Sequence, residues 1–153
     1  MSIEQRLKEL DIILPAPPVP VACYAPYVIA GKLVHIAGQL PLAEGGLSCR
    51  GRLDGNVTIE DGQAAARCCA INVLAQLKAA CGGDLDKVAR CLKLNVFIAA
   101  TADFTRHPEV ANGASELIAA VFGEAGRHAR SSVGVASLPR GASVEVDALF
   151  ELK

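Results

Sequence analysis

The pattern of hydrophobic and polar positions along the 153-residue chain predicts helices and strands in alternation. Residues 58–81 carry apolar side chains at helical spacing, and Thr58 stands where a helix cap is expected. The Gly82-Gly83 pair then ends this helix. Pro108, at a first-turn position, opens a second helix, PEVANGASELIAAVFGEAG.

Strand-like segments surround these two helices. YAPYVIAG and KLVHIAGQLP precede the first helix and meet at a turn formed by Gly31 and Lys32, and GGLSCRGRLDG (45–55) follows them as a loop. KVARCLKLNVFIAA lies between the helices, and its apolar residues alternate. Residues 129–151 read as a closing hairpin. The order β-β-α-β-α-β-β predicts an α+β domain with two helices packed on one face of a sheet.

The first 20 residues stand apart from this pattern. Ser2 and Gln5 have the spacing of a capping box, which predicts a short helix. PAPPVP (15–20) ends that helix and forms a stiff, extended connector. We therefore expect an N-terminal helix and connector over 1–20 and the main domain over 21–153.

The closing hairpin places charged residues in an unusual setting. If its valines, such as Val133, face the helices, the opposite face carries small residues together with Arg130, Glu145 and Asp147. Small side chains on an uncovered sheet face indicate close approach by another subunit, so we expect an oligomer. Pairing across the LPRGA turn sets Gly134 opposite Glu145 and leaves Arg130 about 13 Å along the strand from Glu145.

An arginine in such a contact needs an anion, because burying it alone costs several kcal/mol. Its planar guanidinium suits a carboxylate held through two hydrogen bonds. The residues alone leave two interpretations of Arg130 open, a structural ion pair and a site for a carboxylate ligand.

Composition narrows the class of protein. The formal net charge is −1 and the pI is about 6.3, so the chain has no general electrostatic attraction for nucleic acid or anionic membranes. Hydrophobic residues make up 52% of the chain but aromatic residues only 4%, which predicts a core of Ala, Val, Leu and Ile. The apolar runs are too short to span a bilayer, and the charged N-terminus is not a secretory signal. The six cysteines form no CxxC pair, and Cys68 and Cys69, within the helical pattern, are expected to be small apolar fillers. A reduced, cytoplasmic protein fits this cysteine usage best.

Four segments together resemble one known family. They are APYV (25–28), HIAGQLP (35–41), the helix QAAARCCAINVLAQLKAACGG leading into KLNVF and, above all, ARSSVGVASLPRGASVEVDA. The last contains an arginine-serine strand, an LP turn and an acidic closing strand in order. From Tyr24 to Glu151 the chain resembles the RidA family (also called YjgF), the enamine/imine deaminases once described as ribonucleases or translation inhibitors.

The resemblance implies a chorismate-mutase-like fold with a mixed sheet, and a homotrimer with sites in clefts between subunits. The arginine matching Arg130 would hold the carboxylate of a 2-imino acid. The glutamate matching Glu145 would position a water that attacks the imine carbon and releases ammonia and a 2-keto acid. No cofactor or metal is expected, because an iminium carbon is already electrophilic.

The resemblance extends to further site residues. The main chain of Ser132 would meet the imine nitrogen, Tyr27 would line the cleft from the adjoining subunit, and Gly38 would mark a close backbone approach. Asn112 and Ser115 are the nearest candidates for an asparagine of the second helix. Ser132 stands where a cysteine is common, and the N-terminal extension also indicates a divergent subgroup, so substrate range stays open.

Two other functions compete with deamination. A non-catalytic, trimeric protein that binds or senses a small carboxylate would use the same residues. RNA binding or cleavage is less favoured, because the only compact basic cluster is Arg50-Gly51-Arg52. His128 lies close to Ser132, but no acid-base-serine triad is evident, so we expect a surface or loop histidine.

Overall fold

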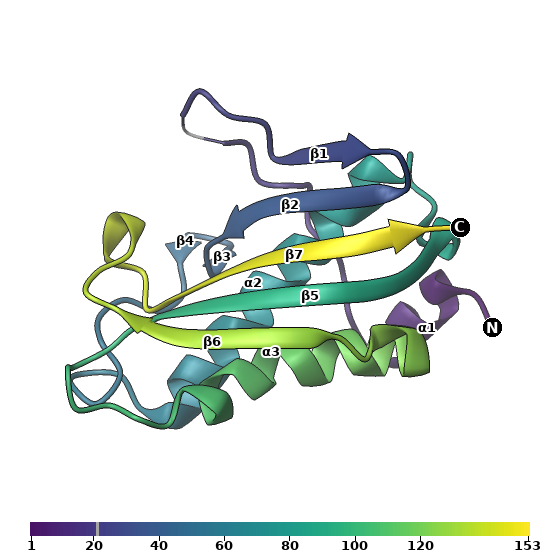
Figure 1. Ribbon diagram of the computed structural model, residues 1–153. Helices are drawn as coiled ribbons and strands as arrows, with labels where there is room; N and C mark the ends of the chain where they lie inside the picture. The colour runs from purple at the N-terminus through teal and green to yellow at the C-terminus, as the bar shows by residue number, and fades with distance from the viewer. Residues whose placement is uncertain (21) are drawn as a thin grey trace.

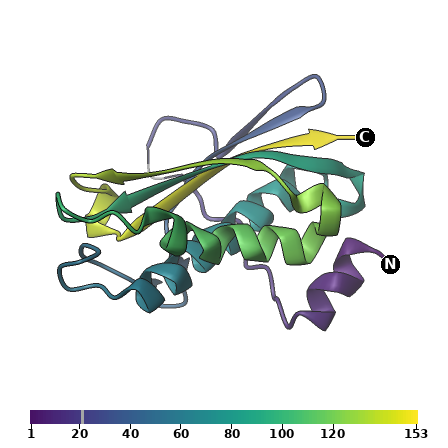
Figure 2. The ribbon, with the colours of Figure 1, turned by 60° about the horizontal axis from the view of Figure 1, so that its bottom comes forward.

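A five-stranded sheet and two long helices form the two layers of the domain (Figures 1 and 2). The computed structural model describes residues 1–20 and 22–153. The helices are α1 (Ile3–Glu9), α2 (Ile59–Ala80) and α3 (His107–Phe122). The strands are β1 (Tyr27–Ala30), β2 (Leu33–Gln39), β3 (Leu42–Ala43), β4 (Gly46–Leu47), β5 (Val88–Ala99), β6 (Ala129–Val135) and β7 (Val144–Leu152). Helices α2 and α3 cover one face of the sheet, as predicted.

The sheet order is β1-β2-β7-β5-β6, with β5 and β6 parallel and the other neighbours antiparallel. The predicted hairpin over 129–151 is therefore wrong, because β5 lies between β6 and β7. Helix α3 supplies the crossover that a parallel β5–β6 pair requires. Residues 136–143 then connect β6 to β7, and a link of this length spans far more than the roughly 10 Å across one intervening strand. A β3–β4 hairpin also occupies part of the predicted 45–55 loop.

Local signals explain where α2 and α3 begin. The Thr58 hydroxyl accepts a hydrogen bond from the Asp61 backbone N–H at 3.1 Å, which caps α2. Pro108 lies in the first turn of α3. The Thr58 cap and the first-turn position of Pro108 both agree with the sequence prediction.

The core between helices and sheet consists mainly of aliphatic residues, as the composition predicts. Small residues on α2, including Ala66 and Cys69, are fully buried and let the helix approach the sheet closely. Burial raises the pKa of the Cys91 thiol to about 12, so this cysteine acts as an apolar filler. None of the described helices is both long and apolar enough to cross a lipid bilayer.

Strand β6 presents its charged face to the helices, which corrects the predicted orientation of its valines. Arg130, Ser132 and Gly134 pair in register with buried residues of β5 that face α2 and α3. Register partners point to the same side of a sheet, so Val133 lies on the open face, where 47% of it is exposed. Along β7 the even-numbered apolar residues are buried, and Glu145 alternates onto the open face. Arg130 and Glu145 of one chain therefore lie on opposite faces of the sheet.

Candidate functional site

Glu145 lies where β2 comes closest to β7. The β2–β7 register shifts between Ile36 and Gln39, and Gly38 occupies this irregularity. A Cβ atom at position 38 would lie 2.8 Å from Cδ of Glu145 and closer still to Oε1. Glycine at this position therefore leaves the space that the Glu145 carboxylate fills.

Glu145 and Gly38 line a cavity of about 300 Å³. The polar part of the lining includes Gln39 and Arg140, which lies in the turn before β7. The apolar part comes from the N-terminal segment and from the residues after β2: Pro18, Val19, Pro20, Ala22, Pro26, Leu40 and Leu42. A carboxylate thus borders a largely apolar space, which is the usual character of a small-molecule site.

The carboxylate of Glu145 is more basic than an ordinary glutamate. Burial raises the pKa of Glu145, and the negative charge of Asp147 raises it further. Burial also raises the pKa of Asp147, opposed by the hydrogen bond that Asn95 Nδ2 donates to its Oδ1 at 2.7 Å. Glu145 can therefore exchange a proton closer to neutral pH than a solvated carboxylate can.

Arg130 lies on the other face of the sheet, held against α3. Its Nη1 donates to Oδ1 of Asn112 at 2.9 Å and to Oγ of Ser115 at 3.0 Å, and its Nη2 donates to the Pro108 carbonyl at 3.4 Å. A guanidinium has five N–H donors. The Nε–H and one Nη2–H have no acceptor in the part of the chain that the structure describes, so they can bind a carboxylate.

His128 fixes the orientation of the Ser115 hydroxyl. Its Nδ1 lies 2.6 Å from the Gly126 carbonyl, which can only accept, so Nδ1 donates. In the neutral ring Nε2 is then an acceptor, and it receives the Ser115 hydroxyl at 2.9 Å. A lone pair of Ser115 remains for Arg130. His128 lies in the loop before β6, as expected, but it is half-buried and belongs to the support of Arg130.

The structure divides the predicted site residues into two groups. Gly38 and Glu145 meet at the cavity. Asn112 and Ser115 contact Arg130, and Ser132 follows Arg130 on the same face of β6. Tyr27 begins β1 and does not line the described cavity; its role in an adjoining subunit stays a prediction.

Apart from Gly38 and Glu145, the residues that line the cavity were not predicted from the sequence. The polar ones among them are Tyr24, Gln39, Gln76 and Arg140. Gln39 and Arg140 stand within quoted family motifs, HIAGQLP and SLPRGA, so their proximity to Gly38 and Glu145 was a usable signal. Tyr24 had no such signal, because its position depends on the path of the N-terminal segment.

Comparison with known proteins identifies close relatives over nearly the whole length. The chain is 52% identical over 151 residues to Protein TCP17 of Trypanosoma cruzi, covering 98% of this chain and 94% of the relative. The crystal structure of Atu1372, a protein of unknown function from Agrobacterium tumefaciens, is 49% identical with a TM-score of 0.92, covering 99% of this chain and 92% of that one. A putative endoribonuclease from Shewanella oneidensis is 33% identical with a TM-score of 0.95, covering 99% and 100%.

A family model described as "YjgF/chorismate mutase-like, putative endoribonuclease" matches residues 4–151. This match spans the fold, the Glu145 cavity and the Arg130 cluster, and it confirms the resemblance found in the sequence motifs. The chain belongs to the YjgF (RidA) family, with its chorismate-mutase-like fold.

Proposed function

We propose that this protein hydrolyses 2-imino acids to 2-keto acids and ammonia at sites formed between subunits of a homotrimer. The observation that supports this most directly is the placement of Arg130 and Glu145 on opposite faces of one sheet. One small ligand cannot touch both side chains of a single chain. Arg130 of one subunit and Glu145 of the next can meet on the same ligand when the open face is covered by a neighbour.

In the proposed reaction, Arg130 binds the substrate and Glu145 transfers the proton. The free donors of Arg130 hold the carboxylate of the imino acid and orient its C=N bond. Glu145 accepts a proton from a water as the water oxygen bonds to the electrophilic carbon. Glu145 returns this proton to the nitrogen of the resulting carbinolamine. The C–N bond then breaks as the hydroxyl oxygen forms the C=O bond and gives its proton back to Glu145, so ammonia and a 2-keto acid leave.

The raised pKa of Glu145 suits this proton transfer. General-base catalysis is most effective when the pKa of the base lies near the working pH. Burial and the charge of Asp147 both raise the pKa of Glu145 in that direction. In the proposed site the main chain of Ser132, two residues after Arg130 on β6, meets the imine nitrogen.

A coupled assay tests the activity. An amino-acid oxidase or a lyase that releases 2-aminoacrylate generates the imine, and keto-acid release is followed with and without the protein. We expect Glu145→Gln to lower kcat by about 10²- to 10⁴-fold while binding of a 2-keto acid persists. Arg130→Ala should chiefly raise KM. If the wild-type protein accelerates no imine but still binds keto acids, the carboxylate-binding or regulatory alternative replaces the proposal.

Mixed assemblies test whether the site lies between subunits. At substrate concentrations well below the KM of Arg130→Ala, both Arg130→Ala and Glu145→Gln should turn over slowly on their own, but co-refolded chains can join an intact Arg130 to an intact Glu145 across an interface. Random mixing in equal amounts restores about one quarter of the sites of a closed ring. No recovery in mixed trimers would place both residues' functions within one chain and contradict the proposed site.

RNA binding has less support from the 45–55 region. Nη1 of Arg50 donates to the Arg140 carbonyl at 2.6 Å, so part of the basic cluster is engaged in holding the turn before β7. Asn56 accepts from the Arg52 backbone N–H and donates to the Arg50 carbonyl, which orders the loop. Retardation of RNA by the protein at moderate salt would revive this alternative.

A further inference from the structure

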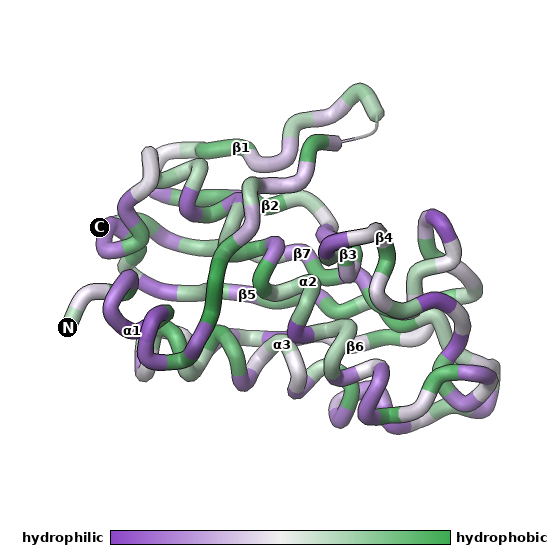
Figure 3. Tube along the Cα trace, turned by 180° about the vertical axis from the view of Figure 1, so that it is seen from behind, coloured by the Kyte–Doolittle hydropathy of each residue, from purple (hydrophilic) through white to green (hydrophobic). Residues whose placement is uncertain are grey.

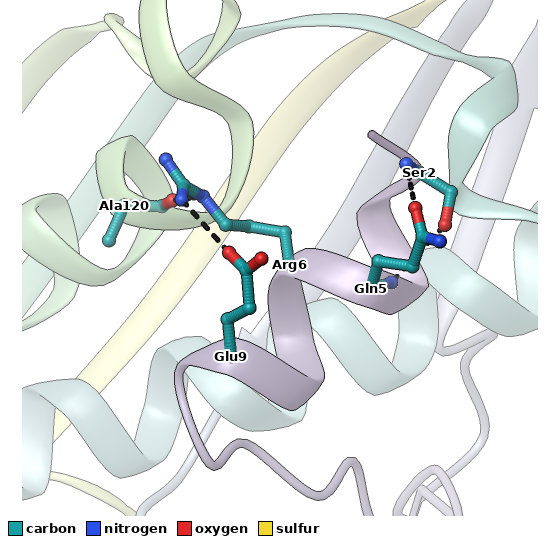
Figure 4. Close-up of polar contacts among 5 residues, drawn as sticks. All are labelled: Ser2, Gln5, Arg6, Glu9 and Ala120. Atoms are coloured by element: carbon teal, nitrogen blue, oxygen red, sulfur yellow. Dashed lines mark hydrogen bonds and ion pairs between the residues drawn. The ribbon is translucent and has the colours of Figure 1, made fainter.

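The N-terminal helix α1 is anchored to the domain rather than extended from it. Nε of Arg6 donates to the Ala120 carbonyl of α3 at 3.0 Å, next to its contact with Glu9 (Figure 4). The backbone N–H of Ile3 donates to Oδ1 of Asp86 at 2.8 Å. Leu7 is buried among the core residues, 3% exposed. These contacts fix the starting point of the chain that follows.

The segment after α1 crosses the helix side of the molecule toward the edge formed by β1 and β2 (Figures 1 and 3). Figure 3 shows its first part as markedly hydrophobic. Gln76 of α2 is 1% exposed, and its Nε2 donates to the Pro18 carbonyl at 2.7 Å. Prolines restrict the backbone around this contact, so a single buried hydrogen bond can fix its path.

This segment forms one wall of the Glu145 cavity. Pro18, Val19 and Pro20 line the cavity together with Glu145, and their side chains are apolar. Val19 is 85% exposed although it is apolar and lines the cavity. An apolar group bound in the cavity would cover part of this exposed apolar surface, and removing that surface from water is favourable. A charged group placed there would lose hydration without gaining a polar partner from Val19.

We infer that residues 18–20, held in place by Gln76, form a subsite for an apolar side chain and make branched aliphatic or aromatic 2-imino acids the preferred substrates. This inference rests on the proposed function of the same cavity. The cavity has a volume of about 300 Å³, which is large enough for a small ligand. It leaves room for a side chain larger than the methyl group of an alanine-derived imine. Val19 contacts the side chain of the substrate, and Gln76, which also borders the cavity, positions the segment through its hydrogen bond to Pro18.

The test compares imines that differ only in their side chain. The imines derived from alanine and from leucine are hydrolysed in parallel, and kcat/KM is measured for each. Three added buried carbons should favour the leucine-derived imine by roughly tenfold or more. Val19→Ser and Gln76→Leu should each reduce this ratio toward one. Ile13→Ser is the matched control, because Ile13 lies in the same segment, is exposed and does not line the cavity; it should keep the wild-type ratio.

Binding of the 2-keto acids separates failure of this inference from failure of the proposed reaction. Calorimetric titration should show 4-methyl-2-oxopentanoate binding roughly tenfold more tightly than pyruvate, with the difference lost in Val19→Ser. That result supports the subsite even when no imine is hydrolysed faster. Equal binding of the two acids by the wild-type protein, or an unchanged ratio in both variants, overturns the subsite while leaving deamination to its own assay.

Discussion

The substitution Gly38→Ala places one methyl group against the carboxylate of Glu145. The added Cβ would lie 2.8 Å from Cδ and 3.1 Å from Cγ of Glu145. Carbon atoms in ordinary contact are about 3.5–4.0 Å apart, so the carboxylate has to move by about 1 Å. Gly38 does not have a positive φ, so alanine meets no backbone strain there.

The fold and the site should respond differently to this change. The clashing atoms belong to the flexible end of one side chain, which can turn away, so we expect the free energy of unfolding to change by less than about 1 kcal/mol. A displacement of about 1 Å at a catalytic group can cost about 100-fold in rate. Gly38→Ala should therefore keep a wild-type Tm and lose about 100-fold in kcat/KM, measured with the coupled imine assay.

Gly82→Ala is a control with the opposite expected result, a loss of stability without a loss of activity. Gly82 follows the C-cap residue of α2 and has a φ of 66°. Among the described residues, apart from its chain neighbours, the only heavy atom within 4 Å of its added Cβ is the flexible Lys87 ammonium at 3.8 Å. Alanine in this left-handed conformation should cost about 1 kcal/mol of stability and leave kcat/KM unchanged. Wild-type kcat/KM in Gly38→Ala would refute the reasoning, because the space reserved at position 38 would then have no catalytic purpose.

Three further substitutions examine the surroundings of the site. Asp147→Asn removes a charge that raises the pKa of Glu145; because the base must be deprotonated, the acid limb of the pH–rate profile should move to lower pH, and a limb that stays or rises contradicts this coupling. Asn112→Ala removes a 2.9 Å hydrogen bond to Arg130, so KM should rise by about tenfold with little change in kcat, as steady-state kinetics can show. Ser143→Ala replaces a fully buried hydroxyl that has no partner among the described residues, and should raise stability by about 1 kcal/mol in a denaturant titration; a loss of stability would reveal an unrecognised partner.

The helices were predictable because their signals are local. The threonine at 58, the proline at 108 and the capping box at Ser2 each act within one turn of the chain, and the structure places helix starts at all three. The family motifs likewise identified Gly38 and Glu145, which do meet at a cavity. These features need no knowledge of which strands become neighbours.

The alternation of apolar and polar residues along a strand does not determine which strands are neighbours or which face of a strand packs against the helices. Alternation separates Arg130 and Ser132 from Val133, but it does not say which set faces the helices. The rule that valine faces the core failed here because α3 carries Asn112 and Ser115, which satisfy the guanidinium on the helix side. The hairpin prediction failed for a related reason, since it placed β6 beside β7 and ignored the parallel crossover through α3.

The corrected orientation changes the argument for an assembly. The sequence favoured an oligomer because small residues and charges were expected together on one uncovered face. In the structure Arg130 faces α3 and has donors without an acceptor among the described residues, whereas Glu145 lies on the open face beside a largely apolar cavity. If both act on one small ligand, the two must come from different chains. Oligomerisation would then be a condition of catalysis, and dissociating the subunits should abolish turnover even when each chain stays folded.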